Sequence, residues 1–215
     1  MTDINIILIG EHRGLVHRIL RQCDKWGDSR EFIKDKADKA DIICVAVRND
    51  KIPGFCLAKN ISTGSELIIA FFATRVLPDY RMMGISKKLI GRAMREFIVR
   101  NKVLKIANWF KPVYFVTATA SPLVYEQITK YKKKEVVKAD ETRIAEMFVK
   151  AFSEGASFDK DTNIIKGGFS GSTECYYSEK DVPLAGDENI NSMFKNVLQV
   201  ATGNGNGLVV VSRIM

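Results

Sequence analysis

The sequence predicts an α/β domain whose central sheet contains one parallel pair of strands. Two apolar runs, residues 67–72 and 113–119, are continuous, as is typical of strands covered on both faces. Between them, apolar residues recur at helical spacing from Ile85 to Phe97, opposite a basic face. A strand, a helix and a second buried strand in this order indicate a parallel pair that a right-handed crossover connects.

The other elements follow from the same patterns. A tight segment at residues 48–51 between two apolar runs is typical of an antiparallel hairpin. Glycines at residues 203–207 predict a turn before the last strand, and residues 153–189 predict an irregular stretch with short strands. In order, we expect strand 4–9, helix 15–23, charged helix 29–39, hairpin strands 42–47 and 52–58, strand 67–76, helix 85–100, strand 113–119, helices 122–131, 141–152 and 190–200, and strand 208–214.

Length and composition favour one globular domain. The chain has 215 residues, of which 46% are hydrophobic and 27% charged, and its formal net charge is +8. No repeat or linker divides it, so we expect a single domain over residues 1–215, with a core at about 4–137 and an extension at about 138–215. No apolar run approaches the roughly 20 residues that span a bilayer. We therefore expect a cytoplasmic protein without a membrane partner.

Cysteine and histidine usage predicts no metal site. The four cysteines are widely spaced without a CxxC pair, and the chain has two histidines, His12 and His17. Cys44 and Cys56 lie in apolar strand-like runs, which favours buried and unreactive thiols. His12 and His17 are five residues apart on the first predicted helix and do not share a face, which favours solvated side chains.

The junction over residues 76–86 combines features of an anion site. Pro78 ends the strand because it removes a backbone donor. Gly84 has no side chain to shield its amide, and the helix that follows begins with amides that have no partner inside the helix. Such a helix start favours a phosphate or pyrophosphate. The alternative interpretation is a plain strand–turn–helix connection with one glycine for geometry.

The same junction resembles the signature of the GNAT superfamily of acyl-CoA-dependent N-acyltransferases. That signature is Val-x-Pro at the end of a hydrophobic strand, then Arg/Gln-x-x-Gly-x-Gly/Ala at the start of a long helix. The chain supplies Val76-Leu77-Pro78 and Arg81-Met82-Met83-Gly84-Ile85-Ser86, and departs only at Ser86. The resemblance implies a mixed, mostly antiparallel central sheet with a splayed parallel pair, flanking helices and a C-terminal extension.

The resemblance also implies how acetyl-CoA would bind, as the acyl donor and without a metal. The amides of residues 82–86 would hold the pyrophosphate, and the backbone of Thr74, Arg75 and Val76 would pair with the pantetheine arm. The residues that it assigns to the cofactor are Thr74, Arg75, Val76, Arg81, Met82, Met83, Gly84, Ile85, Ser86 and Ser121.

Two residues are candidates for catalysis. Many GNAT proteins carry a tyrosine as acid within Asn-x-x-Ala-x-x-x-Tyr on the helix after the fifth strand, and here Ile128 stands at the tyrosine position when Ser121 is aligned with the asparagine. Tyr125 lies one turn earlier and Tyr131 nearly one turn later. Tyr125 is the candidate acid, and an aromatic ring that packs on the sheet or lines the CoA groove is the alternative. Glu66 opens the buried strand, where some members carry a base; its parity matches Thr74 if no bulge intervenes, and a solvated residue is the alternative.

The function that these patterns predict is direct transfer of an acyl group, most simply acetyl, from CoA to an amine of an unknown acceptor. A non-catalytic CoA-binding module and a basic nucleic-acid-binding protein are the alternatives, and a homodimer stays open. The lysine run at residues 130–134 is typical of a solvated helix end. The helix at 81–100 carries six basic residues and one acid, Glu96, so the charge favours an anionic cofactor over nucleic acid.

Overall fold

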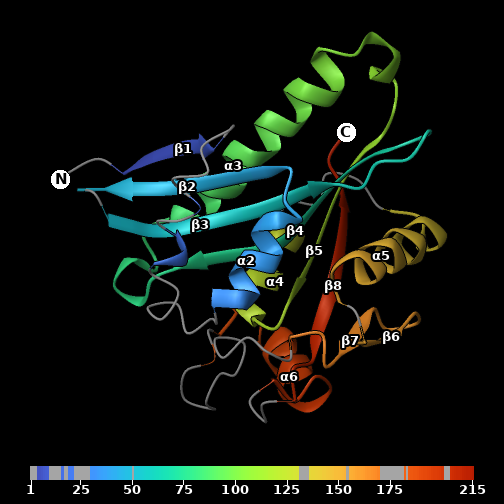
Figure 1. Cartoon of the computed structure of the whole chain (residues 1–215). Helices are drawn as coiled ribbons and strands as arrows, with labels where there is room; N and C mark the ends of the chain where they lie inside the picture. The colour runs from blue at the N-terminus through green and yellow to red at the C-terminus, as the bar shows by residue number, and fades with distance from the viewer. Residues whose placement is uncertain are drawn as a thin grey trace.

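Strands from both halves of the chain form one mixed sheet (Figure 1). The computed structural model describes residues 4–9, 16, 19–21, 30–49, 51–130, 136–153, 155–169, 182, 184–200 and 204–215. Within them the strand order is β1-β2-β3-β4-β5-β8-β7-β6. The strands are β1 (Asn5–Ile9), β2 (Ile42–Arg48), β3 (Lys51–Asn60), β4 (Leu67–Val76), β5 (Val113–Thr119), β6 (Ser157–Asp159), β7 (Ile164–Lys166) and β8 (Gly207–Arg213).

The pairing of the strands confirms the predicted fold class. Among the described strands, β4 and β5 are the one parallel pair, and every other neighbouring pair is antiparallel. The crossover between β4 and β5 contains helix α3 (Ile85–Ile98). The C-terminal extension completes the sheet, because β8 pairs with β5 and the short β7 pairs with β8.

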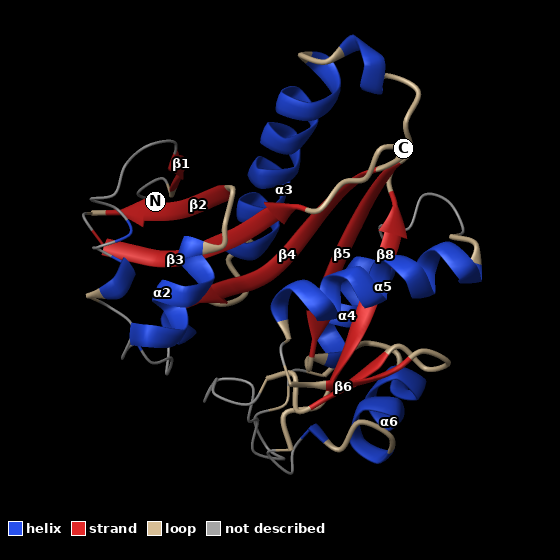
Figure 2. Ribbon diagram, turned by 45° about the vertical axis from the view of Figure 1, so that its right-hand side comes forward, coloured by secondary structure: helices blue, strands red, loops and turns tan. Residues whose placement is uncertain are grey.

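Helices cover both faces of the sheet, and their apolar stripes form the core. Helix α3 buries Ile85, Leu89, Ala93 and Phe97 against one face. On the other face lie α2 (Arg30–Asp38) and α5 (Lys138–Phe152), which Figure 2 shows on the same side of the strands. Helices α4 (Pro122–Lys130) and α6 (Glu188–Asn196) contact each other beside β5 and β8. Because β4 is covered on both faces, its run is apolar at both parities.

Most predicted elements are confirmed, with shifts at their ends. Helix α3 ends at Ile98 and continues as a π-helical turn, Val99–Val103, instead of reaching residue 100 as an α-helix. The Asn101 side-chain amide donates to the Phe97 carbonyl at 3.0 Å, and a side chain that bonds to the helix backbone loosens the regular ladder. Helix α6 ends before Gln199, whose φ is 50°, and not at residue 200.

Several predicted elements lie partly outside the described residues. They include most of the first helix at 15–23, of which Ile19 and Leu20 are described and buried, residue 29 of the charged helix, residue 50 of the tight segment, the end of the helix at residue 131, and the start of the turn at 203. Between α5 and α6, the described part of the irregular stretch contains β6 and β7, as expected.

Candidate functional site

The parallel strands β4 and β5 separate halfway along their length. They pair from Leu67 with Val113 to Phe71 with Thr117, where the Thr117 hydroxyl donates a 2.8 Å hydrogen bond to the Phe71 carbonyl. Beyond this point, among the described residues, β4 pairs only with β3 and β5 only with β8. Figure 2 shows the two strands diverging toward their carboxyl ends. Their facing edges present backbone groups that an extended ligand can bind as an added strand.

A β-bulge in β4 lies at the point of divergence. Phe71 and Ala73 pair with consecutive residues of β3, so that Phe72 is an extra residue between them. A bulge bends its strand and increases the local twist, which turns the end of β4 away from β5. It also reverses the alternation of side chains. Phe71 packs under α3 before the bulge, and Thr74 does so after it, with its hydroxyl 3.3 Å from the Cys56 sulfur.

The bulged residue contacts the end of α5. The Phe72 ring stacks on Phe152, with centroids 4.4 Å apart and planes inclined by 9°. The Phe152 carbonyl accepts a 2.9 Å hydrogen bond from the Lys36 amine of α2. Burial lowers the pKa of Lys36, and the positive charges of Lys39 and Arg75 act in the same direction. Lys36 and Phe152 are 116 positions apart in the sequence, and no local pattern indicated either contact.

The turn after β4 is largely exposed to solvent. Leu77 donates to the Pro53 carbonyl, and a 3₁₀ turn at Pro78–Tyr80 follows. Met82 and Gly84 both adopt the left-handed conformation, with φ of 63° and 70°. Gly84 is the N-cap of α3, is exposed, and has no atom within 4 Å of the position that a Cβ would occupy. Open space, left-handed backbone and the N-terminus of a helix together suit a phosphate-sized anion.

Positive charge surrounds this helix start. Lys87, Lys88 and Arg92 follow Gly84 on α3 and are exposed. The one acid of the helix, Glu96, is bound by Arg100 at 2.6 Å near the other end. The field at the start of α3 therefore adds to the dipole of the helix in favouring an anion.

Gly54 of β3 lets α3 and the end of β4 approach each other. A Cβ at Gly54 would lie 2.7 Å from the Arg75 carbonyl oxygen and 3.3 Å from side-chain atoms of Ile85 and Val76. These three residues are part of the predicted cofactor site. The absence of a side chain at Gly54 thus fixes the distance between the end of β4 and the start of α3.

We expect Gly54→Ala to lower the free energy of unfolding by about 1–3 kcal/mol, because the Arg75 carbonyl must move to admit the new methyl group. Gly64→Ala is the matched control, since no atom lies within 4 Å of its Cβ position. Urea unfolding of both variants measures the difference. Equal midpoints and slopes for the two variants would contradict this account of Gly54.

Glu66 is placed away from the other predicted site residues. It lies at the opposite end of β4 from Thr74, about 26 Å along the strand at roughly 3.3 Å per residue. Because the bulge at Phe72 intervenes, its parity no longer matches that of Thr74. Both carboxylate oxygens accept hydrogen bonds from Arg143 of α5, at 2.6 and 2.5 Å, and the residue is buried. Glu66 is the ion-pair partner of Arg143, and its hydrogen bond raises the pKa of Arg143.

Ser121 joins the diverging end of β5 to α4. Its hydroxyl accepts from the Val124 amide at 3.4 Å, and Pro122 occupies the first helical position, an N-terminal arrangement that favours a helix. The Thr119 hydroxyl accepts from the Ser121 amide at 3.0 Å. Ser121 is buried, so it organises the backbone at this strand end.

Tyr125 lies one turn into α4, and its amide donates to the Ser121 carbonyl at 3.0 Å. It is half-buried, and its ring packs against Phe194 of α6 at a centroid distance of 5.7 Å. Burial raises the pKa of its hydroxyl, and the negative charge of Glu141 acts in the same direction. Ile128, at the position where the family motif has its tyrosine, packs against the core cluster beneath α3.

Glu126 is a buried acid of α4 that the sequence analysis missed. Its carboxylate accepts backbone hydrogen bonds from Gly186 and Asp187, just before α6, and pairs with Lys130 at 3.2 Å. These hydrogen bonds lower its pKa. Glu126 thereby attaches α6 to the helix that carries Tyr125.

The cysteines, the histidines and the lysine run are the other groups that the sequence analysis considered. Cys44 and Cys56 are free and buried, as predicted, and burial raises the pKa of each thiol to about 12. His12, His17 and residues 131–134 of the lysine run lie outside the described residues. Within the described part of the chain, no three His, Cys, Asp or Glu side chains are grouped as metal ligands would be. Helices there are also too short or too polar to cross a bilayer.

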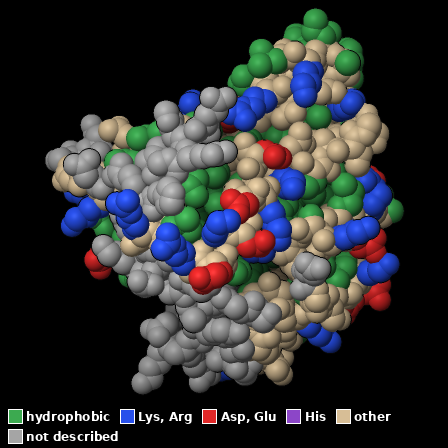
Figure 3. Space-filling model, in the orientation of Figure 1, with side chains coloured by type: hydrophobic (Ala, Val, Ile, Leu, Met, Phe, Trp, Pro, Cys, Tyr) green, Lys and Arg blue, Asp and Glu red, His purple; other side chains and the backbone are tan. Residues whose placement is uncertain are grey.

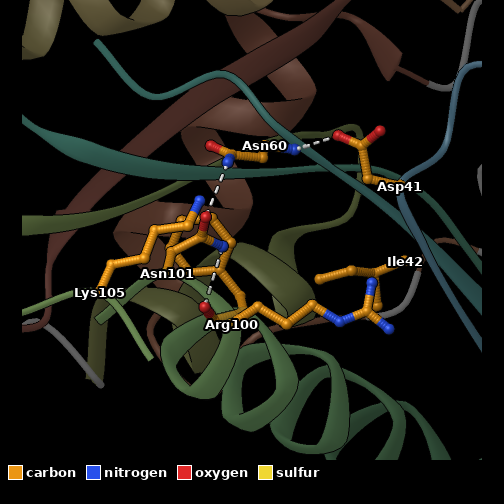
Figure 4. A pocket seen from close by; sticks show the side chains of 7 residues that line it. Asp41, Ile42, Asn60, Arg100, Asn101 and Lys105 are labelled. Carbon is orange, nitrogen blue, oxygen red and sulfur yellow. Dashed lines mark hydrogen bonds between the residues drawn. The ribbon is translucent and has the colours of Figure 1, made fainter. Parts of the chain in front are cut away.

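Two cavities lie away from the diverging strands. One, of about 370 Å³, opens between β2, β3 and the end of α3, and is lined by Asp41, Ile42, Asn60, Phe97, Arg100, Asn101 and Lys105 (Figure 4). Its amides bond to one another, since Asn60 donates to the Asn101 side-chain oxygen at 3.1 Å. The other, of about 280 Å³, lies between the start of α4 and α6.

Solved structures that are similar to this chain are GNAT-family acetyltransferases. No protein-family model and no curated protein sequence matches it. An acetyltransferase from Elizabethkingia anophelis with acetyl-CoA bound is 13% identical, with 98% of this chain and 97% of that chain covered at a TM-score of 0.49. The ribosomal-protein-S18-alanine N-acetyltransferase from Escherichia coli is 9% identical, with 98% and 94% covered at 0.45. A further Escherichia coli GNAT acetyltransferase, in complex with CoA, is 12% identical, with 61% and 73% covered at 0.45.

Proposed function

We propose that this protein is an N-acyltransferase that binds an acyl-CoA, most simply acetyl-CoA, between the diverging strands and passes the acyl group to an amine. One observation carries the proposal: the parallel strands separate at the bulge at Phe72, and the freed end of β4 leads directly into the left-handed Gly84 and the start of α3. An extended arm with a pyrophosphate at one end suits this succession of open strand edge and anion site.

The predicted site residues would have different roles according to their position in the fold. Backbone groups of Thr74, Arg75 and Val76 would pair with the pantetheine arm, and the amides of residues 82–86 would hold the pyrophosphate. Ser121 is a support for the end of β5 that faces the thioester. The Glu66–Arg143 ion pair fixes α5 on the opposite face and takes no part in the chemistry.

The transfer itself is a direct displacement. The bond from the acyl carbon to sulfur breaks as the bond to the amine nitrogen forms. The nitrogen releases one proton to solvent, and the leaving thiolate takes one proton. Tyr125 is the candidate donor, because α4 begins where β5 ends and the raised pKa keeps its hydroxyl protonated at neutral pH. The bound amine must be neutral to attack, which predicts a rate that rises with pH until the amine is deprotonated.

Two measurements on the full chain test the proposal. Acetyl-CoA at 100 times its Kd should stabilise the fold by about 2.7 kcal/mol through binding to the native state, and so raise the thermal midpoint. Thiol release from acetyl-CoA should then appear when primary amines, amino-acid amides and peptides with free N-termini are supplied. No change in midpoint at millimolar acetyl-CoA would overturn the proposal.

A second candidate is a CoA-binding module without catalysis. The position of Ile128 favours it, because the side chain at the family's tyrosine position lies against the core. This alternative predicts the same rise in thermal midpoint with no thiol release for any amine.

We expect Glu66→Gln to reduce stability and spare catalysis. The change removes the charge that Arg143 binds, and loss of a charge-assisted hydrogen bond at this half-exposed arginine costs about 1–3 kcal/mol. Urea unfolding measures the loss, and thiol release per folded molecule should stay within twofold of wild type. Unchanged stability with a large fall in turnover would instead make Glu66 the base.

A further inference from the structure

Large apolar side chains are exposed at the connection between α3 and β5. We call residues 99–111 the α3–β5 tip. Its exposed apolar residues, with their exposed fractions, are Val99 39%, Val103 56%, Leu104 72%, Ile106 81%, Trp109 57% and Phe110 99%. A soluble surface has single apolar residues as a rule, and a contiguous group of this kind marks a contact surface.

The tip is an ordered structure. The π-helical turn closes with a hydrogen bond from the Leu104 amide to the Val99 carbonyl at 3.0 Å. The Asn108 side chain donates to the Asn101 carbonyl at 2.7 Å, and the Trp109 amide donates to the Ile106 carbonyl at 3.0 Å. These bonds hold Trp109 and Phe110 at a fixed corner, so their exposure is part of the fold.

All charged side chains of the tip are positive. It contains Arg100, Lys102, Lys105 and Lys111, and no Asp or Glu. Figure 3 shows hydrophobic atoms at the top of the molecule, where α3 ends, with Lys and Arg side chains beneath them. Arg100 and Lys105 also line the polar cavity at the base of the tip, which contains one acid, Asp41 (Figure 4). The Asp41 carboxylate already accepts a 2.9 Å hydrogen bond from the Asn60 amide.

We propose that the α3–β5 tip docks the protein on the surface of an anionic phospholipid bilayer. Trp109, Phe110, Leu104 and Ile106 enter the boundary between headgroups and acyl chains, where aromatic residues are favoured. Lys105 and Lys111 stay at the level of the headgroups, where basic residues gain from anionic lipid. The contact is peripheral and concerns no segment that crosses the bilayer.

Charge and side-chain type select this partner over two others. A second copy would bring Lys102, Lys105 and Lys111 against the same three lysines at the same patch, which opposes self-association. Single-stranded nucleic acid stacks its bases on aromatic rings, but Leu104, Ile106 and Val103 offer no stacking surface. Aliphatic and aromatic side chains beside lysine, without an acid, fit the bilayer interface best.

Vesicle binding of the full chain tests the proposal. We expect it to sediment with vesicles of phosphatidylcholine and phosphatidylglycerol at 7:3 in low salt, and at least fivefold less with pure phosphatidylcholine or in 0.5 M NaCl. Trp109→Ser with Phe110→Ser should reduce sedimentation at least fivefold. Val137→Ser is the matched control, because Val137 is 69% exposed and lies at the N-cap of α5.

Tryptophan fluorescence gives a second readout. Addition of the anionic vesicles should shift the emission to shorter wavelength in wild type, and Trp109→Phe should remove that shift while keeping most of the sedimentation. Equal sedimentation of wild type and the double variant would overturn the proposal. The proposal would also be overturned if wild type bound an oligonucleotide but no lipid and the double variant bound neither. It would equally be overturned if wild type were a dimer and the double variant a monomer. The acetyl-CoA response should be the same in all of these variants.

Discussion

We expect Gly84→Val to abolish the acetyl-CoA-dependent rise in thermal midpoint and to lower the affinity for acetyl-CoA tenfold or more. Two effects of the substitution combine. The valine side chain occupies the open space at the N-cap of α3, where the pyrophosphate would approach the first amides. A β-branched residue also resists the left-handed φ of 70°, which costs about 1–2 kcal/mol in stability. Differential scanning fluorimetry with and without acetyl-CoA measures both effects.

Two further variants separate crowding from strain. Gly84→Asn keeps the left-handed backbone at little cost, because asparagine tolerates it, but still adds a side chain. It should fold like wild type and still lose most of the response. Gly91→Ala lies on the same helix, exposed and with open space, and should gain about 1 kcal/mol of stability with the response unchanged. A full acetyl-CoA response in both Gly84 variants would remove the helix start from the proposed site.

The order of elements could be predicted from the sequence because the signals are local. The continuous apolar run of β4 indicates a strand that is buried on both faces. The apolar stripe from Ile85 to Phe97 indicates that one face of α3 packs on the sheet. Each signal depends on residues that are close in the sequence. The resemblance to a known signature then added the sheet type, and the pairing of β4 with β5 confirmed it.

The arrangement around the site could not be predicted in the same way. The bulge at Phe72 follows from how β4 meets β3, and one extra residue there was enough to reverse the face on which Glu66 had been expected. The partner of Glu66, Arg143, is 77 residues away in the sequence. The exposure of Trp109 and Phe110 depends on the π-helical turn, which residue periodicity alone does not report.

We expect Tyr125→Phe to lower the rate of thiol release about 100-fold, the lower end of the effect of general acid–base groups. The phenyl ring keeps the packing against Phe194, so the thermal midpoint and its rise with acetyl-CoA should stay at wild-type values. Because burial and Glu141 raise the pKa of the hydroxyl, wild type should keep its donor protonated at neutral pH and lose activity only in the alkaline range, above that raised pKa. In Tyr125→Phe this alkaline loss should be absent.

Tyr80→Phe is the control for the loss of a tyrosine hydroxyl. Tyr80 lies in the turn before α3, is half-buried, and has its ring 5.9 Å from the Arg48 guanidinium, a contact that phenylalanine preserves. Its turnover should stay within twofold of wild type. Full turnover in Tyr125→Phe would show that the thiolate takes its proton from water. Acyl transfer would then depend only on how the protein positions the thioester and the amine. A lower midpoint together with lower turnover would instead place Tyr125 in the packing between α4 and α6. The two results differ in the midpoint, so a single pair of measurements on each variant decides which role the hydroxyl has.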